Sequence, residues 1–162
     1  MNLSELYSMI NGDLISQITS HEGLSVFASE NAKFEGWLKV ELINILKKKN
    51  QRPIPETNWV DIVFDNIAIE LKTINTNYKF DNVNRKTKPI TDNTGGIIQD
   101  IEKLKRKDAL IGFVVFVVFP CEHENKFWQK QFQLIEGKLK ELVYQKFTFA
   151  NGIPGVIYYG KI

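Results

Sequence analysis

Cysteine is nearly absent: Cys121 is the single one among 162 residues. An internal disulfide is therefore excluded, and a reducing intracellular setting is expected. The segment from Met1 to Ile10 has no basic start followed by an apolar run, so we expect no signal peptide. The longest apolar run, Leu110–Phe119, is far shorter than the roughly 20 residues of a membrane-spanning helix. The sequence predicts a cytoplasmic protein with no membrane partner.

An excess of charge of one sign is also missing. The chain has 21 Lys and Arg against 19 Asp and Glu, a formal net charge of +2, so any affinity for nucleic acid must come from local clusters. The histidines, His21 and His123, are far apart, and Cys121-x-His123 has no second pair to complete a zinc motif. No glycine-rich phosphate loop is found. The length, with 43% hydrophobic and 25% charged residues, predicts a single domain over residues 1–162.

Apolar periodicity predicts an α/β domain. Helical spacing is found in Leu3–Thr19, Ala32–Lys49, Gly95–Lys107 and Asn125–Lys146. Strand-like runs are Trp59–Phe64, Ile67–Ile74, Leu110–Phe119 and Val156–Tyr159. Pro53 and Pro55 limit the segment between them to an edge strand at best, and Asn75–Thr94 is expected to be a long loop. The order of the elements predicts a mixed central sheet flanked by helices.

The two strand-like runs before the long loop are joined by Asp65-Asn66, a favourable two-residue hairpin turn. With this turn, Asp61 faces Glu70 directly, and alternation of side chains puts Lys72 on the same face. The opposite face is wholly apolar and is predicted to be core. It consists of Val60, Ile62, Phe64, Ile67, Ile69 and Leu71.

Two carboxylates placed opposite each other destabilise a sheet, and Lys72 relieves only part of the repulsion. A divalent cation between Asp61 and Glu70 explains the pair better. Hard oxygen ligands at this spacing suit Mg²⁺, with Mn²⁺ as an alternative. Lys72 beside the ion is placed to polarise an attacking water and to stabilise developing negative charge. The other interpretation is a solvated hairpin face with an ordinary Glu–Lys pair.

The pattern D-x8-E-x-K, carried by Val60-Asp61 and Glu70-Leu71-Lys72, resembles the signature of the PD-(D/E)XK, or restriction-endonuclease-like, nuclease superfamily. An acidic residue in the preceding helix, at Phe34-Glu35, also fits. The resemblance extends in order over roughly 32–119. The chain departs from the pattern where Val60 replaces the proline of the name, and where prolines obscure the strand before Asp61.

The resemblance implies a restriction-endonuclease-like core and metal-dependent hydrolysis of phosphodiester bonds, most naturally in DNA. Asp61 and Glu70 would be metal ligands, joined by the backbone carbonyl of Leu71. Lys72 would be the catalytic lysine and Glu35 an auxiliary acid, with Glu41 left open as an alternative. Cutting both strands of a duplex needs two clusters, so a homodimer is natural.

The loop after the second strand has a basic set predicted to contact nucleic acid, together with the aromatic residues Tyr78 and Phe80. A solvent-exposed loop explains the same residues equally well. The basic set is Lys79, Arg85, Lys86 and Lys88.

Three further ambiguities remain open. The basic run from Lys103 to Lys107 is either a second patch or a solvated helix end. Asp65 is favoured as a turn residue. Gln99 and Asp100 either reach the site or belong to a polar helix face.

Restriction, repair or junction-resolving, and mobile-element nucleases are not separated by the sequence. Two hypotheses of another class stand beside the enzyme: a catalytically inactive nucleic-acid-binding module, and an interaction subunit that needs a partner chain.

Overall fold

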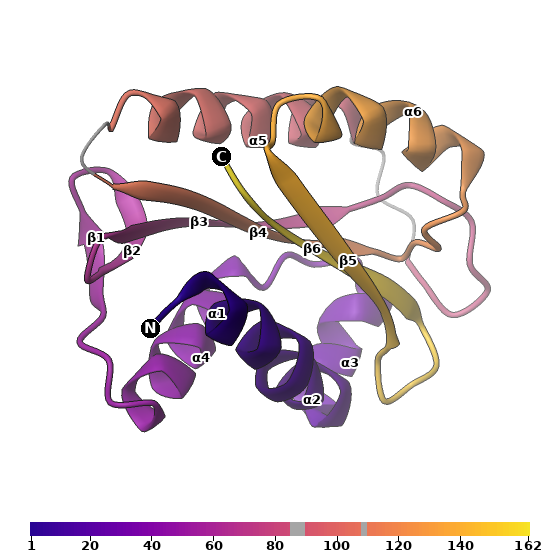
Figure 1. Ribbon diagram of the computed structural model, residues 1–162. Helices are drawn as coiled ribbons and strands as arrows, with labels where there is room; N and C mark the ends of the chain where they lie inside the picture. The colour runs from indigo at the N-terminus through magenta and orange to yellow at the C-terminus, as the bar shows by residue number, and fades with distance from the viewer. Residues whose placement is uncertain (85–89, 108–109) are drawn as a thin grey trace.

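The computed structural model describes residues 1–84, 90–107 and 110–162, and within them helices pack on both faces of one six-stranded sheet (Figure 1). The strand order across the sheet is β1 (Ile54–Thr57), β2 (Val60–Phe64), β3 (Ile67–Asn75), β4 (Ile111–Phe119), β6 (Pro154–Lys161) and β5 (Glu141–Thr148). β3 and β4 are parallel, and the other neighbours are antiparallel. The predicted α/β class with a mixed sheet is therefore confirmed.

The N-terminal helices cover one face of the sheet (Figure 1). They are α1 (Leu3–Met9), the π-helical turn η1 (Ile10–Leu14), α2 (Ile15–Ser20), α3 (Glu22–Ser29) and α4 (Glu35–Lys48). Asn2 and Glu5 form a reciprocal capping box that starts α1. The predicted helix Leu3–Thr19 is thus three consecutive helical segments, and α3 had no counterpart among the predicted elements.

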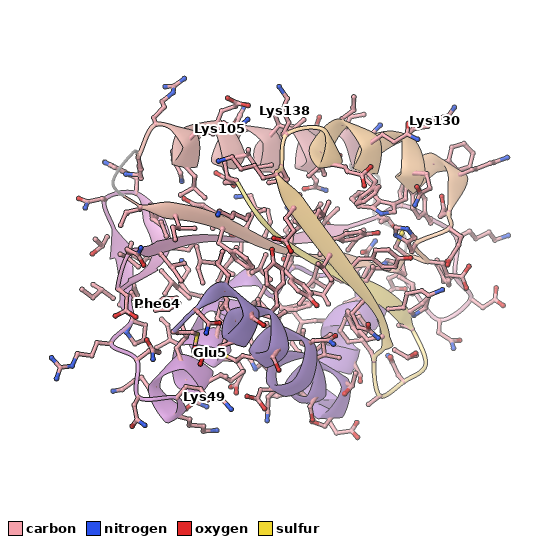
Figure 2. All side chains as sticks on the ribbon, viewed as in Figure 1. Glu5, Lys49, Phe64, Lys105, Lys130 and Lys138 are labelled. Carbon is pink, nitrogen blue, oxygen red and sulfur yellow. The ribbon has the colours of Figure 1, made fainter. Side chains whose placement is uncertain are left out.

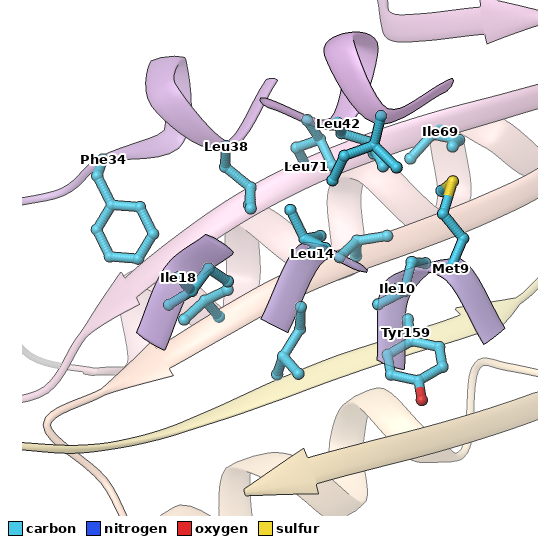
Figure 3. Packing of buried hydrophobic residues seen from close by; sticks show 14 of the residues in the cluster. Met9, Ile10, Leu14, Ile18, Phe34, Leu38, Leu42, Ile69, Leu71 and Tyr159 are labelled. Atoms are coloured by element: carbon cyan, nitrogen blue, oxygen red, sulfur yellow. The ribbon is translucent and has the colours of Figure 1, made fainter. Parts of the chain in front are cut away.

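The opposite face is covered by α5 (Ile90–Lys105) and α6 (Lys126–Glu136). Two buried clusters result, one on each side of the sheet. Figure 3 shows part of the first, in which Leu14 and Leu38 lie near Leu71 of β3, and Ile10 lies beside Tyr159 of β6. In Figure 2, Phe64 lies on this same side of the sheet. β4 is buried on both faces, as its continuous apolar run predicts. Among the described residues, no helix has the length and apolar character needed to cross a membrane.

The predicted helix Asn125–Lys146 is wrong in its second half. Helix α6 ends at Glu136, and residues 141–148 form the edge strand β5, paired with β6. Leu139 and Leu142 continue the helical apolar spacing, but Gly137 has low helix propensity and the chain beyond is rich in β-branched and aromatic residues. Residues 141–148 form a strand because they pair with the backbone edge of β6 that β4 leaves free.

The predicted loop Asn75–Thr94 is also too long, because α5 begins at Ile90. Gly95 and Gly96 therefore lie inside the helix and do not mark its start. The segment at Pro53–Pro55 contributes to β1, an edge strand as expected.

Candidate active site

The β2–β3 hairpin has the predicted two-residue turn. The paired residues are Phe64↔Ile67, Val63↔Ala68 and Ile62↔Ile69. Asp65 occupies the turn with a φ of 48°, and its Oδ2 lies 3.4 Å from the N-terminal amine of Met1. The preference for Asp65 as a turn residue is therefore confirmed.

Regular pairing does not continue to Asp61, which corrects the prediction that Asp61 and Glu70 form a cross-strand ladder pair. Instead, Asp61 Oδ2 accepts a hydrogen bond of 2.8 Å from the backbone N–H of Leu71. Two residues further along β3, Glu35 Oε2 accepts one of 3.2 Å from the N–H of Thr73. Beyond the point where β2 stops pairing with β3, side-chain carboxylates thus accept the hydrogen bonds that the backbone N–H groups of β3 would otherwise donate to a neighbouring strand.

The departure of β2 also changes the face of Val60. Ile62 and Phe64 belong to the cluster under the N-terminal helices, as predicted, but Val60 joins the cluster on the α5–α6 side. The prediction that Val60 shares the apolar face with Ile62 is therefore wrong. Alternation of faces holds for regularly paired strands, and pairing with β3 ends at Ile62.

Helices from both layers reach the open edge of β3. α4 contributes Glu35 from its first turn, and α5 contributes Asp100 and Lys103. Together with the strands they surround a cleft of about 580 Å³. Its lining residues are Glu35, Glu56, Asn58, Trp59, Val60, Asp61, Glu70, Lys72, Asp100 and Lys103. The structure brings all four side chains predicted to be catalytic into this one cleft.

Lysines pair with the acids of the cleft. Lys39 Nζ lies 2.7 Å from Asp61 Oδ1 and 2.7 Å from Glu56 Oε1. Lys103 forms an ion pair with Glu70. Lys39 is not among the predicted site residues, although it lies four residues after Glu35, a spacing that puts both on one side of a helix.

Lys72 is held by the α5 layer. Its Nζ lies 2.9 Å from Asp100 Oδ2, and Lys103 Nζ lies 3.6 Å from Asp100 Oδ1. A Cβ at Gly96 would lie 3.6 Å from Lys72 Cε, so this helical glycine faces the lysine side chain closely. Asp100 therefore belongs to the cleft, whereas Gln99 is exposed.

Burial sets the protonation of Glu70, whose side chain is only 5% exposed. Burial raises its pKa from 4.5 to about 7; Lys103 opposes the rise, and Asp61 adds to it. Burial also acts to raise the pKa of Asp61, but hydrogen bonds from Lys39 and the Leu71 N–H outweigh it and hold that pKa below its ordinary value. The side chain of Glu70 also acts to lower the pKa of Asp61, so the two carboxyl groups are neighbours.

Lys72 keeps its charge in this environment. Burial disfavours the ammonium, but the hydrogen bond to Asp100 outweighs burial and raises the pKa of Lys72 above its ordinary value. The cleft therefore combines a charged carboxylate, a carboxyl group that titrates near neutral pH, and a fixed cation. Such separation of protonation states among neighbours is frequent at functional sites.

Two carboxylates of the cleft are candidate ligands for a hydrated Mg²⁺. Within residues 1–84, 90–107 and 110–162, no group of three or more His, Cys, Asp or Glu side chains is arranged to hold an ion. Mg²⁺, however, is commonly bound by one or two carboxylates, with waters and substrate phosphate completing its octahedron. Asp61 and Glu70 are such a pair, and an extended residue such as Leu71 presents its N–H and C=O on the same side of the strand.

Other predicted residues lie elsewhere. Glu41 does not line the cleft and accepts a hydrogen bond from Asn44, so the structure places Glu35 at the site instead. Lys79 is exposed and lines a separate pocket with Tyr78 and Phe80. Of the run from Lys103 to Lys107, only Lys103 lines the cleft. Arg85, Lys86 and Lys88 lie outside the described residues.

No protein-family model, curated protein or solved structure matches this chain.

Proposed function

We propose that this chain is a metal-dependent nuclease with a restriction-endonuclease-like core, which hydrolyses phosphodiester bonds in DNA. One observation carries the proposal: Asp61, Glu70 and Lys72 meet in one cleft, at the edge of β3 left open by β2, with Glu35 beside them. Two neighbouring carboxylates and a positioned lysine are a combination that suits phosphate chemistry.

Asp61 and Glu70 would hold Mg²⁺ or Mn²⁺ with the carbonyl of Leu71. The bound ion supplies Lewis-acid stabilisation of the phosphate and lowers the pKa of water. Lys72, oriented by Asp100, donates a hydrogen bond to the attacking water and offsets the negative charge that develops on the phosphate. Glu35 is held by the Thr73 N–H and accepts a proton from water at the rim.

Both proposed metal ligands form ion pairs with lysines of the protein. Ion binding would draw Glu70 away from Lys103 and Asp61 away from Lys39. The ammonium groups of both lysines would then be free to face the substrate phosphates. A duplex substrate would be cut in both strands by a homodimer, because each chain has one cluster.

The test is cleavage of plasmid, single-stranded and branched DNA by the purified protein with Mg²⁺ or Mn²⁺. Wild type is expected to cut, and Asp61→Ala and Lys72→Ala are expected to lose at least about 100-fold in rate. Glu41→Ala is the control for Glu35→Ala, because both acids lie on α4 but only Glu35 lines the cleft. A wild type that cuts nothing, or a Lys72→Ala variant that cuts equally well, overturns the proposal.

A second candidate is a binding module without catalysis. The observation in its favour is that Asp61, Glu70 and Lys72 each have an ion-pair partner within the protein. On this hypothesis the cluster is a structural network, and DNA binding would need no metal. Salt-dependent DNA binding without cleavage, unchanged in Lys72→Ala, would favour it.

A further inference from the structure

Trp59 lies at the tip of the β1–β2 hairpin and is 89% exposed, more than any other large hydrophobic side chain in the described parts of the chain. The tip is a two-residue turn, with Thr57 paired to Val60 and with φ values of 53° at Asn58 and 63° at Trp59. Positive φ at both positions is the geometry of a turn that favours Asn followed by Gly. Asn58 fits that preference, whereas a bulky indole at the second position does not.

Tryptophan is therefore unfavourable at this position for two reasons. A left-handed backbone disfavours any side chain with a Cβ, and an exposed indole leaves a large apolar surface in water. A residue that breaks a local rule without a compensating contact in the folded protein is the kind retained for function. The question is what the indole contacts.

The β1–β2 turn that carries Trp59 lies beside the candidate active site. Trp59 lines the same cleft as Asp61, Glu70 and Lys72. Lys107, just beyond α5, donates a hydrogen bond of 2.7 Å from Nζ to the carbonyl oxygen of Asn58, which ties the tip to the helix layer that orients Lys72. The backbone of the turn that carries the indole is thus held beside the carboxylate–lysine cluster.

We propose that Trp59 is a stacking platform for an unpaired base next to the scissile phosphate, so that the substrate class is single-stranded or locally splayed nucleic acid. The proposal rests on the proposed function for the phosphate site. Every base has a π-face on which an indole can stack, but in a duplex these faces are covered by neighbouring bases. A cleft of about 580 Å³ beside the ring has room for one splayed nucleotide.

The test measures equilibrium binding, in the absence of divalent metal, to a labelled single-stranded oligodeoxynucleotide and to a duplex of the same sequence. Trp59→Ala should raise the Kd for the single strand by about 5- to 150-fold, the effect of losing one stacked base, and change duplex binding much less. Trp59→Phe should restore part of the affinity because it keeps an aromatic face. Phe27→Ala is the matched control, since Phe27 of α3 is also an exposed aromatic residue, at 43%, but does not line the cleft.

A second variant separates the role of Trp59 in binding from its role in folding. Trp59→Gly gives the turn its preferred residue, so it should melt at a higher temperature than wild type while binding the single strand more weakly. Loss of binding together with gain of stability is not the signature of a merely structural residue.

Three results overturn the inference: no single-strand binding by wild type, an unchanged Kd in Trp59→Ala, or equal losses for single strand and duplex. The last would indicate general contact with the nucleic acid. Failure of the proposed function is a separate result. Trp59-dependent binding without cleavage would refute the nuclease but support the stacking role of Trp59. Lys72-dependent cleavage without an effect of Trp59 would refute the stacking role alone.

Discussion

The carboxylate of Asp61 accepts a hydrogen bond of 2.8 Å from the backbone N–H of Leu71, at the point where β2 no longer pairs with β3. An N–H that a neighbouring strand would ordinarily satisfy is satisfied here by an acid of the candidate site. Asp61 therefore has a structural role beside the metal-binding role proposed for it, and substitution can separate the two.

Asp61→Asn keeps an oxygen that can accept the hydrogen bond from Leu71 but removes the charge that faces Lys39 and a metal ion. We expect loss of cleavage with a modest loss of stability. Asp61→Ala removes both roles and should cost about 1–3 kcal/mol more, because it also leaves the partly buried N–H of Leu71 without an acceptor. Urea denaturation measures the difference, and equal stability of the two variants would refute the structural role.

Lys103 forms an ion pair with Glu70 and, on the proposed function, would compete with a metal ion for it. Lys103 also lowers the pKa of Glu70, so the comparison is made at a pH well above that pKa, where Glu70 is charged in both proteins. Lys103→Ala should then bind Mg²⁺ at least about fivefold more tightly than wild type, because a nearby positive charge that opposes the ion is removed. Lys105→Ala is the control, since Lys105 lies on the same helix and pairs with Glu102 outside the cleft. Isothermal titration calorimetry measures both affinities; weaker Mg²⁺ binding in Lys103→Ala would contradict the assignment of Glu70 as a ligand.

Glu70 should make the stability of the metal-free protein depend on pH. Its pKa rises from 4.5 to about 7 on folding, so the folded state binds the proton more tightly than the unfolded state. The free energy of unfolding is then expected to fall as the pH rises through this interval, by at most about 3 kcal/mol. Burial of the charged form is the cause.

Chemical denaturation of wild type and Glu70→Gln between pH 4.5 and 7 isolates this contribution. The glutamine variant should show a flatter profile. The lowered pKa of Asp61 acts below its ordinary value of 3.8 and so lies outside the interval. A wild-type profile that is flat or rises relative to the variant would show that burial does not dominate at Glu70.

The edge strand β5 packs closely on β6 at Gly160. A Cβ added there would clash with the backbone oxygen of Glu141, so Gly160→Ala should push the strands apart and lower stability by about 1–3 kcal/mol. Gly137→Ala is the control: its φ is −62° and the nearest atom, Gln133 O, is 3.5 Å away. The control should be neutral or slightly stabilising in a thermal melt. If Gly160→Ala were equally neutral, the close β5–β6 contact would be refuted.

The central hairpin could be predicted because its determinants are local. The turn at Asp65-Asn66 and the alternation of apolar residues set the register from Phe64↔Ile67 to Ile62↔Ile69 without reference to the rest of the chain. The trio of Asp61, Glu70 and Lys72 could be singled out for the same reason, since charges on one strand face are conspicuous beside an apolar face.

Beyond that hairpin, sequence pattern alone was insufficient. Leu139 and Leu142 fit a helical stripe as well as a strand. Residues 141–148 form β5 because the free backbone edge of β6 is available for pairing. Likewise, the backbone N–H groups of Leu71 and Thr73 donate to the carboxylates of Asp61 and Glu35 instead of to a strand. Sequence pattern does not show where pairing between β2 and β3 ends, and this decides it.

The sequence by itself determined the α/β class, the hairpin turn and the acids and lysine of one short motif, because propensity and periodicity act between near neighbours. Tertiary structure alone decided that Lys39 and Lys103 face those acids, that burial raises the pKa of Glu70, and that Trp59 stands exposed at the rim. These are relations between residues distant along the chain, and they exist only once both helix layers have packed against the sheet.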